Sequence, residues 1–179
     1  MKIIKSILLI VAVIVVVALI AALFVKKEYA LERSIVVNKP NSTVFEYVKL
    51  IKNQNYYSVW NMKDPSAKKE YKGTDGTVGF VASWESNNKE VGKGEQEIIK
   101  IVEGERIDLE LRFKEPFEAT DYAYMSTETV ADNQTRVRWG FNGKMPYPMN
   151  LMLVFMNMDE MLGKDLATGL DNLKTNIEK

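Results

Sequence analysis

The sequence contains no cysteine and no histidine. The chain therefore cannot form a disulfide, a thiolate nucleophile, a Ser-His-Asp or Cys-His couple, or a zinc site built from the usual ligands. Neither sign of charge is in excess, because 24 lysines and arginines balance 24 acidic residues. These absences exclude several classes of enzyme, and we expect neither a metal nor a cofactor.

The most prominent feature that is present is a long apolar run near the N-terminus. It begins at Ile7, ends at Val25, contains no charged residue and has two lysines on each side. As a helix it would be about 28 Å long, close to the hydrocarbon core of a bilayer at about 30 Å. A cleaved secretory signal is the alternative, but it would need a shorter apolar stretch and a small-x-small cleavage site. We therefore expect residues 1–27 to form an uncleaved, single-pass membrane anchor.

The sidedness of this anchor rests on a nearly tied count of flanking lysines. The short basic tail ahead of the run is typical of a signal-anchor, which places the N-terminus in the cytoplasm and residues 28–179 outside it. Without the four flanking lysines, this second part has fewer basic than acidic residues. A domain with net negative charge has no evident electrostatic reason to bind nucleic acid.

Residues 28–179 show the pattern of a single α+β domain. A strand is predicted over 29–37, followed by a helix from about 41, where Asn41, Ser42 and Thr43 offer N-cap side chains and Glu46 completes a capping box. Residues 53–63 predict a short irregular helix or a loop.

The remainder of the domain predicts a sheet followed by a long helix. Apolar and polar residues alternate between positions 67 and 142, with turn residues at short intervals, which predicts six antiparallel strands. The glycine pair at 92 and 94 has no following helix and no third glycine, so it indicates a bulge or bend and not a nucleotide loop. From Asn150 to about Ile177 the apolar spacing is helical.

This order of elements, with its local sequences, resembles the START-like or Bet v 1-like helix-grip superfamily, and within it the polyketide cyclase/dehydrase and lipid-transport group. The sequences that carry the resemblance are IVVNKP at 35–40, VF at 44–45, W at 60, VGF at 78–80, W at 84, GKGEQ at 92–96, TRVRW at 135–139 and GLDNLK at 169–174. The resemblance implies a curved seven-stranded antiparallel sheet wrapped around a long C-terminal helix, with an apolar cavity between them. Family members bind lipids, sterols, polyketides and hormones, and some catalyse cyclisation or dehydration.

Under this fold, one set of residues is expected between sheet and helix, either as ordinary core or as the wall of a ligand pocket. The set is Phe80, Trp84, Gln96, Leu109, Leu111, Phe113, Trp139, Phe155 and Met158. Polar residues of the strand after Phe117 could also face inward. Counting back from Thr135 favours Tyr122, Tyr124 and Glu128, whose hydroxyl and carboxyl groups are the weak candidates for acid-base chemistry. The alternative interpretation of Glu128, without a functional role, is a solvated residue at the edge of the sheet.

Three functions remain open from the sequence. The first is a membrane-anchored protein that binds a hydrophobic small molecule or lipid in the cavity, which predicts a dry cavity of roughly 300 to 1,000 Å³. The second is a cyclase/dehydrase-like enzyme that works without histidine or cysteine. The third is an interaction or regulatory domain whose cavity has collapsed.

Overall fold

A computed structural model describes residues 2–179 of the chain. The helices are α1 (Lys2–Phe24), α2 (Asn41–Lys49), α3 (Val59–Lys63) and α4 (Met158–Glu178), with two 3-10 helices, η1 (Ile51–Tyr56) and η2 (Met149–Val154). The strands are β1 (Glu28–Val37), β2 (Lys68–Lys72), β3 (Val81–Glu85), β4 (Lys93–Val102), β5 (Arg106–Glu115), β6 (Ala119–Ala131) and β7 (Gln134–Lys144).

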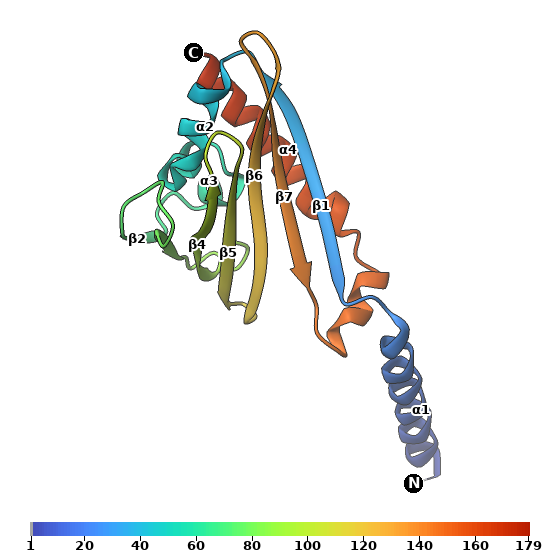
Figure 1. Ribbon diagram of the computed structural model, residues 1–179. Coiled ribbons are helices and arrows are strands. Elements are labelled where there is room, and N and C mark those ends of the chain that lie inside the picture. Colours follow the sequence, from blue (N-terminus) through green and yellow to red (C-terminus); the bar gives the residue numbers. More distant parts are fainter. Residues whose placement is uncertain (1) are drawn as a thin grey trace.

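The seven strands form one antiparallel sheet in the order β1-β7-β6-β5-β4-β3-β2. All neighbours except β1 and β7 are consecutive in the chain. The strand β1 is therefore an edge strand whose partner, β7, comes last in the sequence. The sheet curves, and α4 lies along its concave side while α1 projects away from the domain (Figure 1). This is the α+β helix-grip architecture expected from the sequence.

The core lies between the inner face of the sheet and α4. Every second residue of the central strands points inward, and Ile107, Leu109, Met125 and Val137 are all buried. From the helix, the core takes the apolar side chains that recur along one stripe of α4, which are Leu166, Leu170 and Leu173. The helix can approach this closely because position 169 is a glycine, where a Cβ would lie 2.8 Å from the Trp139 ring.

The prediction of one helix from Asn150 to Ile177 is wrong at its N-terminal end. Residues 149–154 form η2, and α4 begins only at Met158. The reason is a local cap: the Asn157 side chain accepts a hydrogen bond from the Glu160 backbone N–H, which starts a new helix there.

The predicted capping box at the start of α2 is also absent. The residue at the N-cap is Pro40, and no side chain caps the helix. The Asn41 amide instead donates to the backbone oxygen of Gly104 at 2.6 Å, and Glu46 pairs with Lys49 at 2.8 Å. The side chains of Asn41 and Glu46, which the local sequence pattern predicted to cap the helix, therefore make a tertiary hydrogen bond and an ion pair instead.

The glycine pair before and within β4 produces the predicted irregularity. The pairing of β4 with β5 shifts between Lys93 and Gly94. A Cβ at Gly92 would lie 2.2 Å from the Glu115 backbone oxygen, and one at Gly94 would lie 2.7 Å from the Trp84 ring. Both positions need glycine because neighbouring atoms occupy the space of a side chain.

The N-terminal helix α1 is long and apolar enough to cross a membrane, and almost none of it is buried by the rest of the protein. Its C-terminal end is held by η2, because the Asn150 side-chain amide donates to the backbone oxygens of Ala22 at 2.7 Å and Val25 at 2.9 Å. These are carbonyls that the helix itself leaves without partners. Asn150 is completely buried at this junction.

Candidate functional site

A cavity of about 240 Å³ lies between the inner face of the sheet and the N-terminal half of α4. The sheet contributes residues of β3, β4, β5, β6 and β7, and the helical side contributes η1, α3 and α4. Its lining consists of Gln54, Ser58, Trp60, Asn61, Trp84, Glu90, Val91, Gln96, Leu109, Leu111, Phe113, Glu115, Pro116, Ala123, Trp139, Phe141, Leu162 and Leu166. The volume lies slightly below the range expected from the sequence.

Aromatic rings make up much of the cavity wall. The chain has three tryptophans, and Trp60, Trp84 and Trp139 all line the cavity. The Trp60 and Trp139 rings meet edge to face with centroids 6.0 Å apart, as do the rings of Trp84 and Phe113. Such contacts hold the rings in fixed orientations, so the wall is rigid and apolar.

The polar groups inside the cavity are few and already partly satisfied. The Gln96 side-chain amide donates to the Gln54 side-chain oxygen at 2.9 Å, and Gln54 and Ser58 are both buried. The Trp84 indole N–H donates to the Val91 backbone oxygen at 3.1 Å. A few fixed polar groups in an apolar wall are typical of sites that orient a small hydrophobic molecule.

The exposed members of the lining mark where the cavity opens. Glu90, Glu115 and Pro116 are exposed, whereas Leu109 and Leu166 are buried. The opening therefore lies between the turn that joins β3 to β4 and the turn that joins β5 to β6.

Of the pocket residues expected from the sequence, the structure brings six together around this cavity. They are Trp84, Gln96, Leu109, Leu111, Phe113 and Trp139. Phe80 is buried outside the cavity, where its ring stacks on Tyr71.

The remaining two expected pocket residues lie away from the cavity. Phe155 is 83% exposed because it precedes the new start of α4. Met158, the first residue of α4, lines a separate surface hollow beside Val25 and Leu31.

The prediction that Tyr122, Tyr124 and Glu128 face inward is wrong. Asp121, Ala123, Met125 and Thr127 are the buried residues of β6. The physical reason is a register shift between Thr129 and Ala131 in the β6–β7 pairing, which reverses the parity obtained by counting back from Thr135.

The three acid-base candidates instead belong to the outer face of the sheet. The Tyr124 hydroxyl donates to a Glu32 carboxylate oxygen, and the Arg106 guanidinium lies 3.8 Å from the centre of the Tyr124 ring. Burial, followed by the bond to Glu32, raises the pKa of Tyr124. Glu128 pairs with Arg138 at 2.9 Å. No wall of the cavity includes these groups, so they cannot act on a molecule held there.

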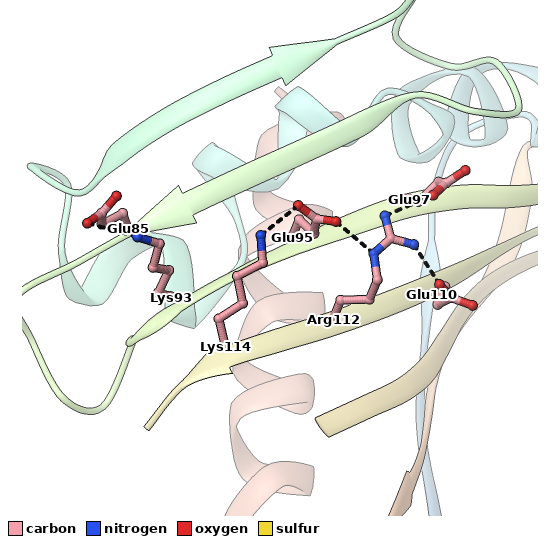
Figure 2. A network of polar contacts seen from close by, with 7 residues as sticks. All are labelled: Glu85, Lys93, Glu95, Glu97, Glu110, Arg112 and Lys114. Atoms are coloured by element: carbon pink, nitrogen blue, oxygen red, sulfur yellow. Dashed lines mark hydrogen bonds and ion pairs between the residues drawn. The ribbon is translucent and has the colours of Figure 1, made fainter. Parts of the chain in front are cut away.

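The outer face carries a second polar cluster, centred on Arg112 of β5 (Figure 2). The Arg112 guanidinium contacts Glu95 at 2.7 Å, Glu97 at 2.8 Å and Glu110 at 2.5 Å. This guanidinium lowers the pKa of Glu95 and in turn has its own pKa raised. Since each carboxylate already has a cationic partner, we interpret the cluster as a set of ion pairs that stabilises the pairing of β4 with β5.

Sequence reasoning did not assign several of the lining residues to the cavity. Gln54, Ser58 and Asn61 come from the segment whose irregular sequence gave no periodicity. Three other lining residues did carry a signal. Leu162 and Leu166 belong to the helical apolar spacing of the last segment, and Phe141 alternates with Trp139 in the last strand.

Comparison with family models gave no match, and no curated protein matched either. Solved structures do match. A protein from Nitrosospira multiformis is 18% identical with a TM-score of 0.59, over 83% of this chain and 96% of its own. A protein from Chromobacterium violaceum is 13% identical with a TM-score of 0.59, over 84% of this chain and 97% of its own.

The structure of Ara h 8.0201 also matches, with 12% identity and a TM-score of 0.53 over 84% of this chain and 97% of that one. The residues 28–179 adopt the Bet v 1-like helix-grip fold. At these identities the likeness defines the fold of this Bet v 1-like domain and leaves its ligand to be argued from the cavity.

Proposed function

We propose that the protein is a membrane-anchored binding protein that holds a hydrophobic small molecule or lipid between its sheet and α4. The observation that carries this proposal is the cavity, which is lined by three tryptophans and two phenylalanines around one hydrogen-bonded amide pair, the buried Gln54 and the half-buried Gln96. Transfer of an apolar molecule into such a space is favoured because it removes apolar surface from water. A cavity of about 240 Å³ suits a compact ligand or one acyl segment of a larger lipid.

The anchor is the second part of the proposal. The helix α1 has the length and composition of a membrane span, and its apolar side chains are left exposed by the domain. We infer a single-pass anchor with the N-terminus in the cytoplasm and the domain outside. Attachment beside the bilayer would shorten the path of a ligand that partitions into lipid.

The tryptophans make the binding test direct. Full-length protein in phosphatidylcholine nanodiscs is titrated with 1-aminoanthracene, a small apolar fluorophore that accepts excitation energy from tryptophan. We expect saturable quenching of tryptophan emission, because all three donors lie in the cavity wall.

The variant Ala123→Phe puts a ring into the cavity and should abolish the saturable part, and Leu111→Phe on the neighbouring strand should weaken it. The matched control is Ala131→Phe, the same change on β6 at an exposed site. Circular dichroism melting checks that each variant folds. Quenching that does not saturate, or that is equal in folded Ala123→Phe and Ala131→Phe proteins, would contradict the proposal.

A further inference from the structure

The end of the domain from which α1 emerges also carries the mouth of the cavity. Glu28, the first residue of β1, pairs with Lys144, the last of β7. The backbone N–H of Lys144 donates to Asp121 near the start of β6. The pairing continues across the sheet, with Phe113 opposite Ala119 and Lys93 opposite both Glu85 and Glu115. The β3–β4 and β5–β6 turns therefore lie at the same end of the sheet as the start of β1 (Figure 1).

This end of the domain exposes large apolar side chains. Phe117, at the tip of the β5–β6 turn, is 76% exposed, and Phe155, just after η2, is 83% exposed. Met149 and Met152 of η2 are also exposed. No other part of the described chain, residues 2–179, covers these side chains. We refer to Phe117, Met149, Met152 and Phe155 as the membrane-proximal apolar surface.

The contacts of η2 show what lies next to this surface. The Asn150 amide holds η2 against the last turn of α1 through Ala22 and Val25, and the Met145 backbone N–H donates to the Lys27 oxygen at 2.8 Å. The part of this surface that η2 carries, Met149 and Met152, is therefore held beside the C-terminal end of α1. Lys26 and Lys27 are exposed at the same level, where lysines contact lipid headgroups.

We propose that the membrane-proximal apolar surface docks on the bilayer that α1 spans, so that the mouth of the cavity opens at the lipid interface. The inference rests on the proposed anchor and deepens it by naming the source of the ligand, which is the adjoining leaflet. Insertion of apolar side chains drives the contact, since amphipathic surfaces bind at the interface in proportion to the apolar area they bury. Glu115 and Glu118 flank the tip at Phe117, so the contact does not require anionic lipid.

The absence of cysteine allows a depth measurement on the full-length chain. Single variants Phe117→Cys, Phe155→Cys, Ile14→Cys and Val130→Cys are spin-labelled in phosphatidylcholine nanodiscs. Ile14 lies within α1, and Val130 is exposed near the opposite end of β6. Collision rates with oxygen, which enters lipid, and with a water-soluble nickel chelate give the depth of each label.

We expect the oxygen-to-nickel ratio at positions 117 and 155 to exceed that at 130 several-fold and to stay below that at 14. A ratio at 117 or 155 equal to that at 130, with a high ratio at 14, would overturn the docking surface and leave the anchor intact. A low ratio at 14 would overturn both. The ligand-binding part of the proposed function is decided separately by the fluorescence titration.

Discussion

Among single residues, Asp121 is the one whose position has the clearest energetic cost. It points inward from β6 near the end of the sheet where β1 begins, and it is buried with one backbone donor, the N–H of Lys144 at 3.0 Å. Burial raises its pKa above the ordinary value. Burial, and to a smaller extent the charge of Asp121, raises the pKa of Tyr29 to about 12. A native state with a raised carboxyl pKa binds a proton more tightly than the unfolded chain, so stability falls as the pH rises through that pKa.

We therefore expect Asp121→Asn to increase the free energy of unfolding at pH 7, because the amide has no charge to desolvate and its oxygen can still accept from Lys144. The gain should disappear near pH 3, where the aspartate is mostly protonated in both states. Urea unfolding at a series of pH values measures this. Glu118→Gln, an exposed carboxylate at the same end, is the control and should change little. A less stable Asp121→Asn protein at pH 7 would show that the carboxylate has a stabilising partner.

At the scale of elements, the contact between α4 and β7 determines the depth of the cavity. Gly169 of α4 faces the Trp139 ring, and a Cβ there would lie 2.8 Å from that ring and 3.3 Å from the Tyr57 backbone oxygen. Trp139 is itself held edge to face by Tyr57 at 5.7 Å and by Trp60 at 6.0 Å. The ring therefore has little freedom to move away.

We predict that Gly169→Ala destabilises the protein by about 1–2 kcal/mol, because the strain of overpacking exceeds the gain of about 1 kcal/mol in helix propensity. Thermal melting followed by circular dichroism measures the change. Ala167→Gly, a half-buried position in the same helix, is the matched control and should lose about 1 kcal/mol from propensity alone. A stabilised Gly169→Ala protein would mean that α4 can move outward freely, and the 1-aminoanthracene titration would then detect an enlarged cavity.

Elements differ in how well the sequence predicts them. In β5 the alternation is uninterrupted, and the face that carries Leu109, Leu111 and Phe113 was correctly predicted as the inner one. In β6 the same reasoning failed, because a shift beyond Thr129 reverses parity and no residue pattern marks it. Gln54 and Trp60 reach the cavity through the packing of η1 and α3, and the cavity volume depends on the distance from α4 to the sheet. Both depend on tertiary packing, which the periodicity of a sequence does not predict.

For the whole molecule, the junction between α1 and the domain has a defined geometry. The buried Asn150 amide connects η2 to two carbonyls at the end of α1, and its side-chain oxygen accepts no hydrogen bond from residues 2–179. Removing the amide would leave Ala22 and Val25 without these donors, and unpaired buried polar groups are costly. The amide therefore holds the domain at a fixed angle to α1.

We expect Asn150→Leu to release this angle while the domain itself stays folded. The measurement is the spin-label distance distribution between labels at Phe24→Cys and Val130→Cys in nanodiscs, which should broaden in the Asn150→Leu background. The control is Asn142→Leu, an exposed asparagine of β7 that pairs with Ala30 of β1 and Tyr122 of β6. An unchanged distribution would show that the chain connection alone sets the orientation.

With α1 inserted in a membrane as proposed above, the pairing of β1 with β7 has a consequence for synthesis of the protein. The strand β1 follows α1 directly and leaves the ribosome first, but its only neighbour in the sheet ends at Lys144. The meander from β2 to β7 can pair as it emerges, whereas β1 waits, tethered to an inserted helix, until nearly all of the chain has been made. Contacts between residues so distant in sequence form slowly, because a long loop must close first. During that interval β1 is an unpaired strand, and its free backbone N–H and C=O groups are open to pairing with another chain.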